Sequence, residues 1–230
     1  SPLCELSKTN MRLRTGISFG LIGLIISRYK KLKDLNVSEP GRTSTVAVKE
    51  AVFPFSRFEA DILLGPEMKS TGEVMGIDQS FGMAIAKAQA SCDNLLPVKG
   101  GTIIVTVNDR DKSTVAPILQ RFHEMGFEIV ATKGTHEYLK DKGIPSEHVY
   151  KVGEGRPNVV DAIKNGEVQL VINTPLGAQS RFDEYEIGRS AIRNKITTIT
   201  TISGAQAAVR GIRNLKTDSI QYHSLQEIFS

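Results

Sequence analysis

Residues suited to binding a phosphate group lie together at Thr132-Lys133-Gly134-Thr135 of this 230-residue chain. Gly134 permits a tight turn that presents backbone N–H groups. Thr135 can cap the helix predicted to follow, and the N-terminus of a helix carries about half a positive elementary charge. The two threonine hydroxyls and these amides could therefore hold a phosphate group.

Further polar residues lie at the ends of neighbouring predicted strands. Lys112 and Lys151 could neutralise the phosphate charge, and Asn173 and Thr174 could recognise a base or a sugar through hydrogen bonds. The same residues also admit purely structural roles. Thr135 would then be a helix cap only, the two lysines would be solvated surface residues, and Asn173-Thr174 would be a strand-end turn.

Patterns typical of catalysis and of metal binding are absent from the sequence. Asp109 and Asp111 could act as catalytic acids, or could belong to a solvated loop with the basic residues beside them. We assign no catalytic residue and no metal ligand, because the four histidines lack metal-site spacing and no Walker, G-x-S-x-G or H-E-x-x-H motif is present. Cys4 and Cys92 are far apart, which excludes a disulfide scaffold and a cysteine-built metal site.

The elements that must position these residues are five apolar, β-branched runs that alternate with helical segments. The predicted strands are 102–107, 127–132, 149–152, 168–174 and 196–201. One helical face carries Val115, Ile118, Leu119 and Phe122, and further helices are expected at 135–142, 158–165, 185–194 and 206–215. This alternation predicts a doubly wound α/β fold with a five-stranded parallel sheet covered on both faces. Ligands bind such sheets beyond the carboxyl ends of the strands.

Three zones differ in composition, and they predict boundaries that give segments 1–45, 46–98 and 99–230. Segment 1–45 is atypical and contains a short apolar run at 16–26 between basic flanks. In 46–98 we expect a strand at 46–55 that ends at Pro54, a turn-rich stretch at 63–78, a helix at 80–90 capped by Ser80, and a linker at 94–101. This middle zone is too small to bury a core alone.

Charge and hydropathy argue against two classes of partner. The net charge of +4 arises in residues 1–50, which carry nine Lys and Arg against four Asp and Glu, so the remaining 180 residues sum to −1. With no zinc-finger or RNP pattern either, we expect no nucleic-acid partner. We expect no membrane association, because no apolar run reaches the roughly 18 residues of a membrane span. A cytoplasmic location is expected, with a plastid as the alternative.

Residues 46–215 resemble the C-terminal part of the large subunit of carbamoyl-phosphate synthase. The segment with the greatest specificity is PEMKSTGEVMG (66–76), which resembles the end of the second ATP-grasp half. The segments that carry the resemblance are VKEAVFPFSRF (48–58), LLGPEMKSTGEVMGID (63–78), DRDK (109–112), GFEIVATKGT (126–135), KVGEGRPNVVDAIKNG (151–166) and VINTPLG (171–177). Residues 102–212 are similar to the methylglyoxal-synthase-like allosteric domain of that family.

This resemblance implies a methylglyoxal-synthase-like fold preceded by a partial ATP-grasp tail. The family enzyme is a glutamine-hydrolysing ligase that makes carbamoyl phosphate for pyrimidine and arginine biosynthesis, with ATP and Mg or Mn as cofactors. Its catalytic ATP-grasp cores lie upstream of the matched region, so the resemblance implies a C-terminal fragment that needs no cofactor of its own. The implied partners are a nucleotide monophosphate effector such as UMP or IMP, the rest of the large subunit, and the small glutaminase subunit.

Carried over by position, the resemblance implies an effector pocket at the strand ends. Pro175 replaces a hydroxyl residue that often follows the Asn-Thr pair in nucleotide-regulated members, and Ala178-Gln179 replaces a basic pair, so the effector itself is not fixed by the resemblance. The implied phosphate pocket comprises Lys112, Thr132, Thr135 and Lys151 beside Gly134, and the ligand-lining positions are Thr106, Asn173 and Thr174.

Two alternatives to a regulatory module remain open at the level of sequence. One is a lyase of the methylglyoxal synthase type that acts on dihydroxyacetone phosphate. That chemistry needs a carboxylate base after the fourth predicted strand, where this chain has Gly177-Ala178-Gln179. The other is a remnant without function, which the unusual first 45 residues would suit.

Overall fold

The computed structural model describes residues 44–52, 72–174, 181–224 and 227. The chain divides into two compact units, one formed by Val46–Ile220 and one by Ser1–Thr45 with Gln221–Ser230. The apolar run at 16–26 lies outside the described residues. The candidate site residues all belong to the unit Val46–Ile220.

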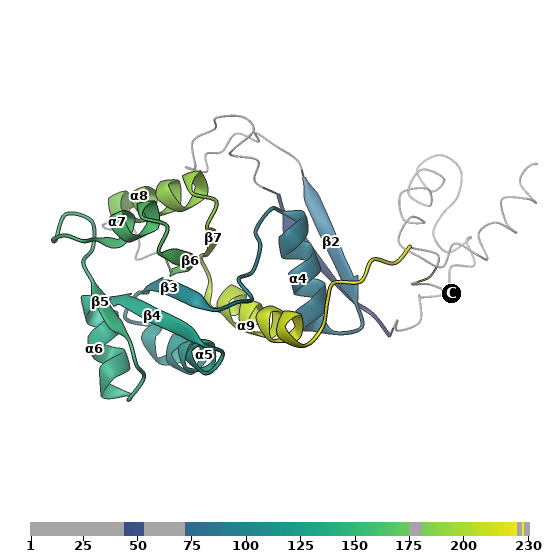
Figure 1. The fold of residues 1–230 in the computed structure, drawn as a ribbon, viewed down its shortest axis with the longest axis horizontal. Coiled ribbons are helices and arrows are strands. Elements are labelled where there is room, and N and C mark those ends of the chain that lie inside the picture. The colour runs from purple at the N-terminus through teal and green to yellow at the C-terminus, as the bar shows by residue number, and fades with distance from the viewer. Residues whose placement is uncertain (1–43, 53–71, 175–180, 225–226, 228–230) are drawn as a thin grey trace, which may run out of the picture. The chain divides into compact units, whose positions relative to one another are not determined.

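A five-stranded parallel sheet forms the centre of this unit (Figure 1). The order of its strands is β5-β4-β3-β6-β7. The central strands β3, β4 and β6 bury mainly apolar side chains, as a sheet covered on both faces requires. The short outer strands differ, because Glu147 and His148 of β5 are exposed and β7 contributes two threonines. The strands are β3 (Gly101–Thr106), β4 (Phe127–Thr132), β5 (Glu147–Val149), β6 (Val168–Asn173) and β7 (Thr197–Ile199).

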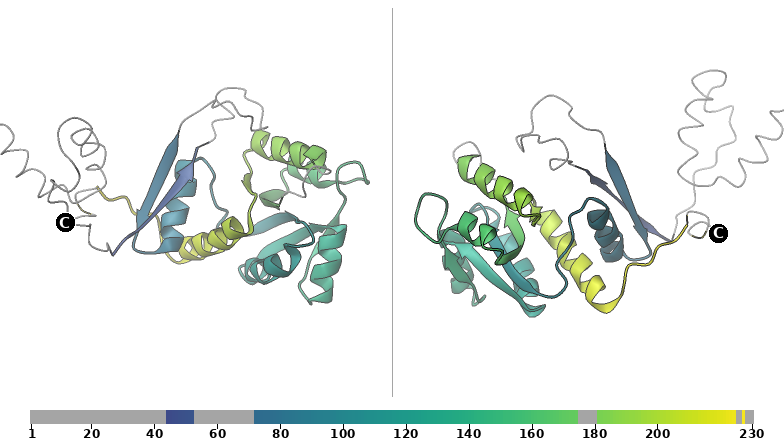
Figure 2. Two further views of the ribbon diagram at one scale, coloured as in Figure 1. Left: turned by 180° about the vertical axis from the view of Figure 1, so that it is seen from behind. Right: turned by 45° about the horizontal axis from the view of Figure 1, so that its top comes forward.

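Helices cover both faces of the sheet, which confirms the predicted doubly wound α/β fold (Figure 2). The chain moves outward from β3 through β4 to β5, then returns to the other side of β3 for β6 and β7. Right-handed crossovers therefore divide the helices between the two faces. One face carries α5 (Lys112–Glu124), α6 (Lys133–Asp141) and α9 (Ile202–Thr217), and the other carries α7 (Val159–Lys164) and α8 (Arg181–Arg193).

Two predicted boundaries near the candidate site are wrong. The third strand of the sheet is Glu147–Val149, so Lys151 follows this strand and does not lie within it. Helix α6 begins at Lys133, and Thr132 occupies its N-cap position in an extended conformation that continues from β4. Thr135 is therefore not the cap. Gly134 lies inside the first helical turn and forms no tight turn.

A small antiparallel sheet and a helix precede the parallel sheet. The turn-rich interpretation of 63–78 is wrong for 73–78, because that stretch pairs residue by residue with the first strand; 63–71 and Pro54 lie outside the described residues. Ser80 caps the helix as predicted, since its hydroxyl accepts a hydrogen bond from Met83 N at 3.1 Å. These elements are β1 (Val46–Ala51), β2 (Glu73–Asp78) and α4 (Phe81–Ser91).

Helix α4 packs between the small sheet and α9, and glycines make both contacts possible (Figure 1). A Cβ atom at Gly76 of β2 would collide with the carbonyl oxygen of Ala84. A Cβ at Gly82 of α4 would lie 2.6 Å from Arg210 O, and one at Gly211 of α9 would lie 2.7 Å from Leu96 Cδ1. The close approach of backbones at Gly76 and Gly82 therefore requires glycine, whereas at Gly211 the neighbouring atom is the end of a side chain. Met83, Ile85 and Leu96 join the buried apolar core on the α5–α9 face of the parallel sheet.

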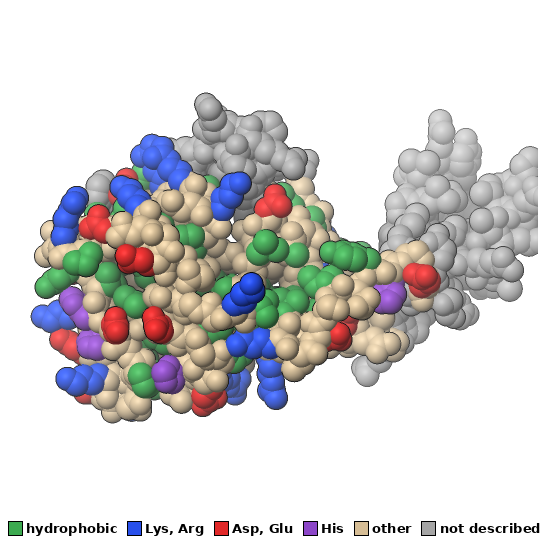
Figure 3. Space-filling model, in the orientation of Figure 1, with side chains coloured by type: hydrophobic (Ala, Val, Ile, Leu, Met, Phe, Trp, Pro, Cys, Tyr) green, Lys and Arg blue, Asp and Glu red, His purple; other side chains and the backbone are tan. Residues whose placement is uncertain are grey.

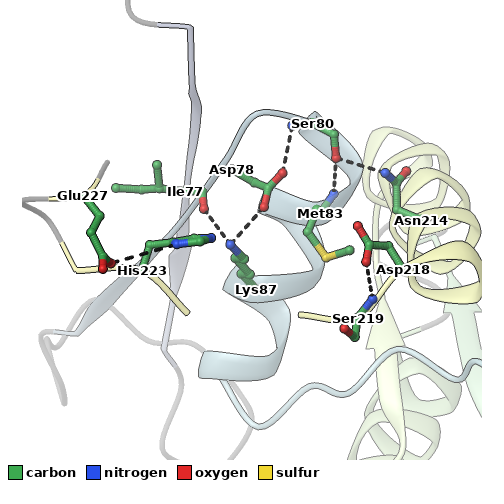
Figure 4. A network of polar contacts seen from close by, with 10 residues as sticks. All are labelled: Ile77, Asp78, Ser80, Met83, Lys87, Asn214, Asp218, Ser219, His223 and Glu227. Atoms are coloured by element: carbon green, nitrogen blue, oxygen red, sulfur yellow. Dashed lines mark hydrogen bonds and ion pairs between the residues drawn. The ribbon is translucent and has the colours of Figure 1, made fainter. Parts of the chain in front are cut away.

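Polar contacts reinforce the same junction of β2, α4 and α9 (Figure 4). Asp78 accepts a hydrogen bond from Ser80 N at 3.0 Å and pairs with Lys87 Nζ at 2.9 Å. Partial burial raises the pKa of Asp78, but the Ser80 amide and the Lys87 ammonium outweigh it and hold this pKa below its ordinary value. Asn214 of α9 donates a hydrogen bond to the Ser80 hydroxyl at 3.0 Å, which joins α9 to the cap of α4.

The surface of the described residues carries charges of both signs. On the face shown in Figure 3, basic and acidic side chains are interspersed across the parallel-sheet region. Among the described residues, no helix combines the length and the apolar character needed to cross a bilayer.

Replacement of Gly76 by alanine will test the close contact between β2 and α4. We expect Gly76→Ala to lower the free energy of unfolding by about 1–3 kcal/mol, the usual cost of overpacking, because neither backbone can retreat freely. Urea denaturation will measure the change. Gly72→Ala is the matched control, since a Cβ there would lie at an ordinary 3.4 Å from Val52 Cβ. Equal stabilities of the two variants would contradict the packing described above.

Candidate functional site

Lys112 places its ammonium group against the first turn of α6. A Cβ atom at Gly134 would lie 3.0 Å from Lys112 Nζ, so the lack of a side chain at position 134 leaves room for the ammonium group. The Lys112 side chain is only 15% exposed. A cation with reduced hydration therefore adjoins a helix N-terminus, and both features favour an anion at the same point.

The first turn of α6 has backbone amides that no side chain caps. The Thr132 side chain forms no capping hydrogen bond, whereas Ser80, Asn158 and Thr201 cap α4, α7 and α9. The first N–H groups of a helix have no partner within the helix. The N-terminus of α6 thus presents several backbone donors beside Lys112.

Two threonine hydroxyls flank these amides. Thr132 and Thr135 are almost fully buried residues, the latter 2% exposed. Within the described residues neither hydroxyl forms a hydrogen bond. Ser190 has the only side-chain polar atom of the described residues that is both shielded from solvent and without a hydrogen-bond partner, so the two threonine hydroxyls are still reached by solvent. Both hydroxyls therefore remain available to an incoming acceptor.

Asp109 forms an ion pair with the ammonium group of Lys112. Its carboxylate oxygen lies 2.6 Å from Lys112 Nζ, and its side chain is 92% exposed. The hydrogen bond from Lys112 holds the pKa of Asp109 below its ordinary value, and the charges of Lys112 and Lys151 lower this pKa further. Lys151, half-buried beyond the end of β5, thus acts electrostatically on the same carboxylate as Lys112.

A second group of polar residues lies where β3 and β6 end side by side. Thr106 and Asn173 are paired neighbours in the sheet, and Thr174 N donates to Thr106 O at 3.0 Å. Thr106, Asn173 and Thr174 are all buried. Asn108 N donates to the Thr174 hydroxyl at 3.2 Å, and the Asn108 side-chain amide reaches the same oxygen at 3.3 Å.

Asn108 is a positioning residue that sequence reasoning did not select. Besides Thr174, it contacts Asp111 twice: Asn108 Nδ2 donates to Asp111 Oδ2 at 2.6 Å, and Asp111 N donates to Asn108 Oδ1 at 3.1 Å. Asp111 is therefore part of the loop's internal bonding. The sequence does hold a signal for this role: an Asn followed by an Asp three residues later, directly after a predicted strand, is typical of a loop held by side-chain hydrogen bonds.

The two groups of residues belong to one edge of the sheet. β3 and β6 are the adjacent strands at which the strand order reverses, and a crevice for ligands forms outside the carboxyl ends at such a point. The loop 107–111 bonds to Thr174 at one end and leads into Lys112 at the other. The structure therefore brings the sequence-predicted residues to one edge, and their role in binding stays a prediction.

Other polar features of the described residues lie apart from this edge or on the surface. No group of three or more His, Cys, Asp or Glu side chains is arranged there to hold a metal ion. Arg156 is exposed and lies 3.9 Å from Asp161, as a surface ion pair. A separate cavity opens at the amino ends of β6 and β7, where Lys195 is the one charged residue that lines it.

Comparison with known proteins places the chain in a family. A sequence model described as the MGS-like domain matches residues 114–200. The chain is 44% identical over 214 residues to the carbamoyl phosphate synthase large chain of Nostoc sp., which covers 93% of this chain and 19% of that protein. The large chain of Gemmatimonas aurantiaca is 50% identical over 213 residues, with 92% and 19% covered. The carbamoyl phosphate synthase large chain, C-terminal section, of Aquifex aeolicus is 47% identical over 197 residues, with 83% and 36% covered.

The chain belongs to the carbamoyl phosphate synthase large-chain family.

Membership of this family confirms the resemblance of residues 46–215 to the C-terminal part of the carbamoyl-phosphate synthase large subunit. The chain spans about a fifth of the length of the large chains it matches, and its residues 114–200 match the MGS-like domain. The matched range 114–200 contains Thr132, Thr135, Lys151 and Asn173, whereas Thr106 and Lys112 precede it. The parallel five-stranded sheet agrees with this assignment.

The pKa of Asp109 reports the proximity of Lys112. We expect Lys112→Met to raise the pKa of Asp109 toward its ordinary value, because the variant removes the hydrogen bond and the larger nearby positive charge. Carboxyl ¹³C NMR titration will measure it. Lys140→Met, which removes an exposed charge from the last turn of α6, serves as the control. The contact is contradicted if both variants leave this pKa unchanged.

Proposed function

We propose that this chain is the regulatory C-terminal part of a carbamoyl phosphate synthase large chain and binds a phosphorylated nucleotide effector, of the UMP or IMP type. The observation that carries the proposal is the contact of the Lys112 ammonium with the uncapped first turn of α6 at Gly134. A phosphate monoester carries about −1.5 to −2 charges at pH 7 and three strong acceptor oxygens. It matches a site that offers a cation, several amides and two hydroxyls.

The phosphate group would sit over the first turn of α6. Its oxygens would accept hydrogen bonds from the amides of that turn and from the hydroxyls of Thr132 and Thr135. Lys112 would supply the first positive charge and Lys151 the second. The low exposure of Lys112 supports this role, because a poorly hydrated ammonium gains more from an anion than a fully solvated one.

The base and sugar of the effector would extend toward the ends of β3 and β6. Thr106 and Asn173 lie there as direct neighbours, and the Thr174 hydroxyl is fixed by Asn108. Pro175 and Ala178-Gln179, the positions that depart from the family pattern, lie outside the described residues. The nature of the base is therefore left open in the proposal.

Regulation would follow from preferential binding to one arrangement of the whole enzyme. An effector shifts a conformational equilibrium only by its difference in affinity for the two states, typically 1–3 kcal/mol. The rest of the large chain and a small glutaminase subunit are the proposed partners. ATP with Mg or Mn would serve those catalytic parts, in pyrimidine and arginine biosynthesis.

Calorimetric titration with UMP and with IMP will test the proposal on the full chain. We expect binding to the wild type, a loss of about tenfold or more in affinity for Lys112→Ala, and a smaller loss for Thr135→Val. The larger effect is expected at Lys112 because donor and acceptor are both charged there, whereas the Thr135 hydroxyl is neutral; a hydrogen bond to a charged group contributes about 1.5–3 kcal/mol. Lys140→Ala is the control and keeps wild-type affinity. Absence of binding at millimolar concentrations of both nucleotides, or equal losses in Lys112→Ala and Lys140→Ala, would refute the proposal.

Gly134→Ala separates binding from stability at the same position. A Cβ there displaces the Lys112 ammonium by a few tenths of an ångström, so we expect weaker nucleotide binding. Stability should be unchanged or higher, because alanine is favoured over glycine in a helix by about 0.5–1 kcal/mol. Thermal unfolding and calorimetric titration of one preparation will show both. Nucleotide affinity as high as that of the wild type would contradict the assigned role of Gly134.

A further inference from the structure

The cation at the centre of the proposed phosphate site already has an anionic partner. Lys112 Nζ lies 2.6 Å from Asp109 Oδ1. Asp109 belongs to the loop that follows β3, and Lys112, three residues later, is the first residue of α5. The Asp109 carboxylate thus accepts a hydrogen bond from the same ammonium group that lies against the first turn of α6.

The two members of this pair differ in their surroundings. The Lys112 side chain is largely covered by protein, whereas that of Asp109 is almost entirely exposed. Lys151 also acts on Asp109. An exposed aspartate can rotate into solvent at little cost, because water replaces the contacts that it gives up. The lysine is therefore the fixed member of the pair, and the aspartate is the movable one.

We propose, on the basis of the proposed function, that Asp109 is an internal competitor for the phosphate site and lowers its affinity for phosphorylated ligands. In the absence of ligand, Asp109 neutralises Lys112. A bound phosphate takes the Lys112 donors and places a second negative charge beside the Asp109 carboxylate. Like charges at this separation disfavour one another, so the carboxylate rotates away and its pair with Lys112 is lost.

Asp111, the other aspartate of the loop, does not share this role. Its carboxylate accepts a hydrogen bond from Asn108, and its backbone amide donates to the same residue. Replacement of Asp111 would disturb the loop itself. Asp109 is the carboxylate of this loop that pairs with the site cation, so the competition can be removed there with one isosteric change.

Asp109→Asn tests the competition directly on the full chain. Inorganic phosphate and UMP are titrated separately into the wild type and the variant at fixed pH and ionic strength. We expect the variant to bind both ligands about two- to fivefold more tightly, the range that exposed ion pairs produce. Asp109→Glu keeps the charge and is expected to bind like the wild type. Asp141→Asn, an exposed change at the far end of α6, controls for net charge. Thermal unfolding will confirm that all variants are folded.

The outcomes separate this inference from the proposed function. If the wild type binds UMP and Asp109→Asn binds it equally or more weakly, the competition is refuted and the proposed function stands. Weaker binding would mean that Asp109 positions Lys112 for the ligand. An equal gain in Asp141→Asn would also refute the competition, because it would reflect net charge alone. If neither the wild type nor Asp109→Asn binds either ligand, both the inference and the proposed function are wrong.

Discussion

The parallel alignment of all five central strands is the constraint from which the rest of this structure follows. Parallel neighbours cannot be joined by hairpins, so each strand is followed by a crossover helix, and every strand ends at the same edge of the sheet. That edge therefore collects the loops after β3, β4 and β6, which come from distant parts of the sequence. It also collects the N-terminus of α6. The topology of the sheet brings the polar residues of the candidate site together, and a short sequence motif alone could not place residues so far apart in the chain side by side.

The same arrangement concentrates positive charge at one edge of the sheet. The Lys112 ammonium is partly shielded from water and adjoins the positive end of a helix. Opposite charges attract more strongly where water is partly excluded. Asp109 supplies the negative charge from the solvent side, where its own carboxylate remains hydrated. A hydrogen bond from Lys112 keeps the pKa of Asp109 low, so the pair persists to lower pH than a free aspartate would allow.

Much of the fold could be predicted from the sequence, because its strong signals are local. The apolar runs of the sheet and the cap at Ser80 rely on neighbouring residues, and the structure confirms them. Strand β2 was missed because its pairing with β1 outweighs the turn-forming residues around it. The start of α6 was placed at Thr135, since a Thr-Lys-Gly-Thr segment satisfies the rules for a turn as well as those for a helix start. Asn108 was missed because its partner Thr174 lies 66 residues away. Such a contact depends on the adjacency of β3 and β6, which no local pattern encodes.

Helix α9 connects the edge at which the parallel strands end with the small sheet and helix that precede the parallel sheet. It begins directly beyond β7, where the Thr201 hydroxyl accepts a hydrogen bond from Gly204 N at 3.0 Å. Its 16 residues span about 24 Å at 1.5 Å per residue, and its C-terminal half packs on α4 around Gly211. One continuous helix thus contacts both the strand-end edge and the junction with the small antiparallel sheet. Because a Cβ atom at Gly82 would lie only 2.6 Å from Arg210 O, any larger residue there would force α4 and α9 apart at that junction.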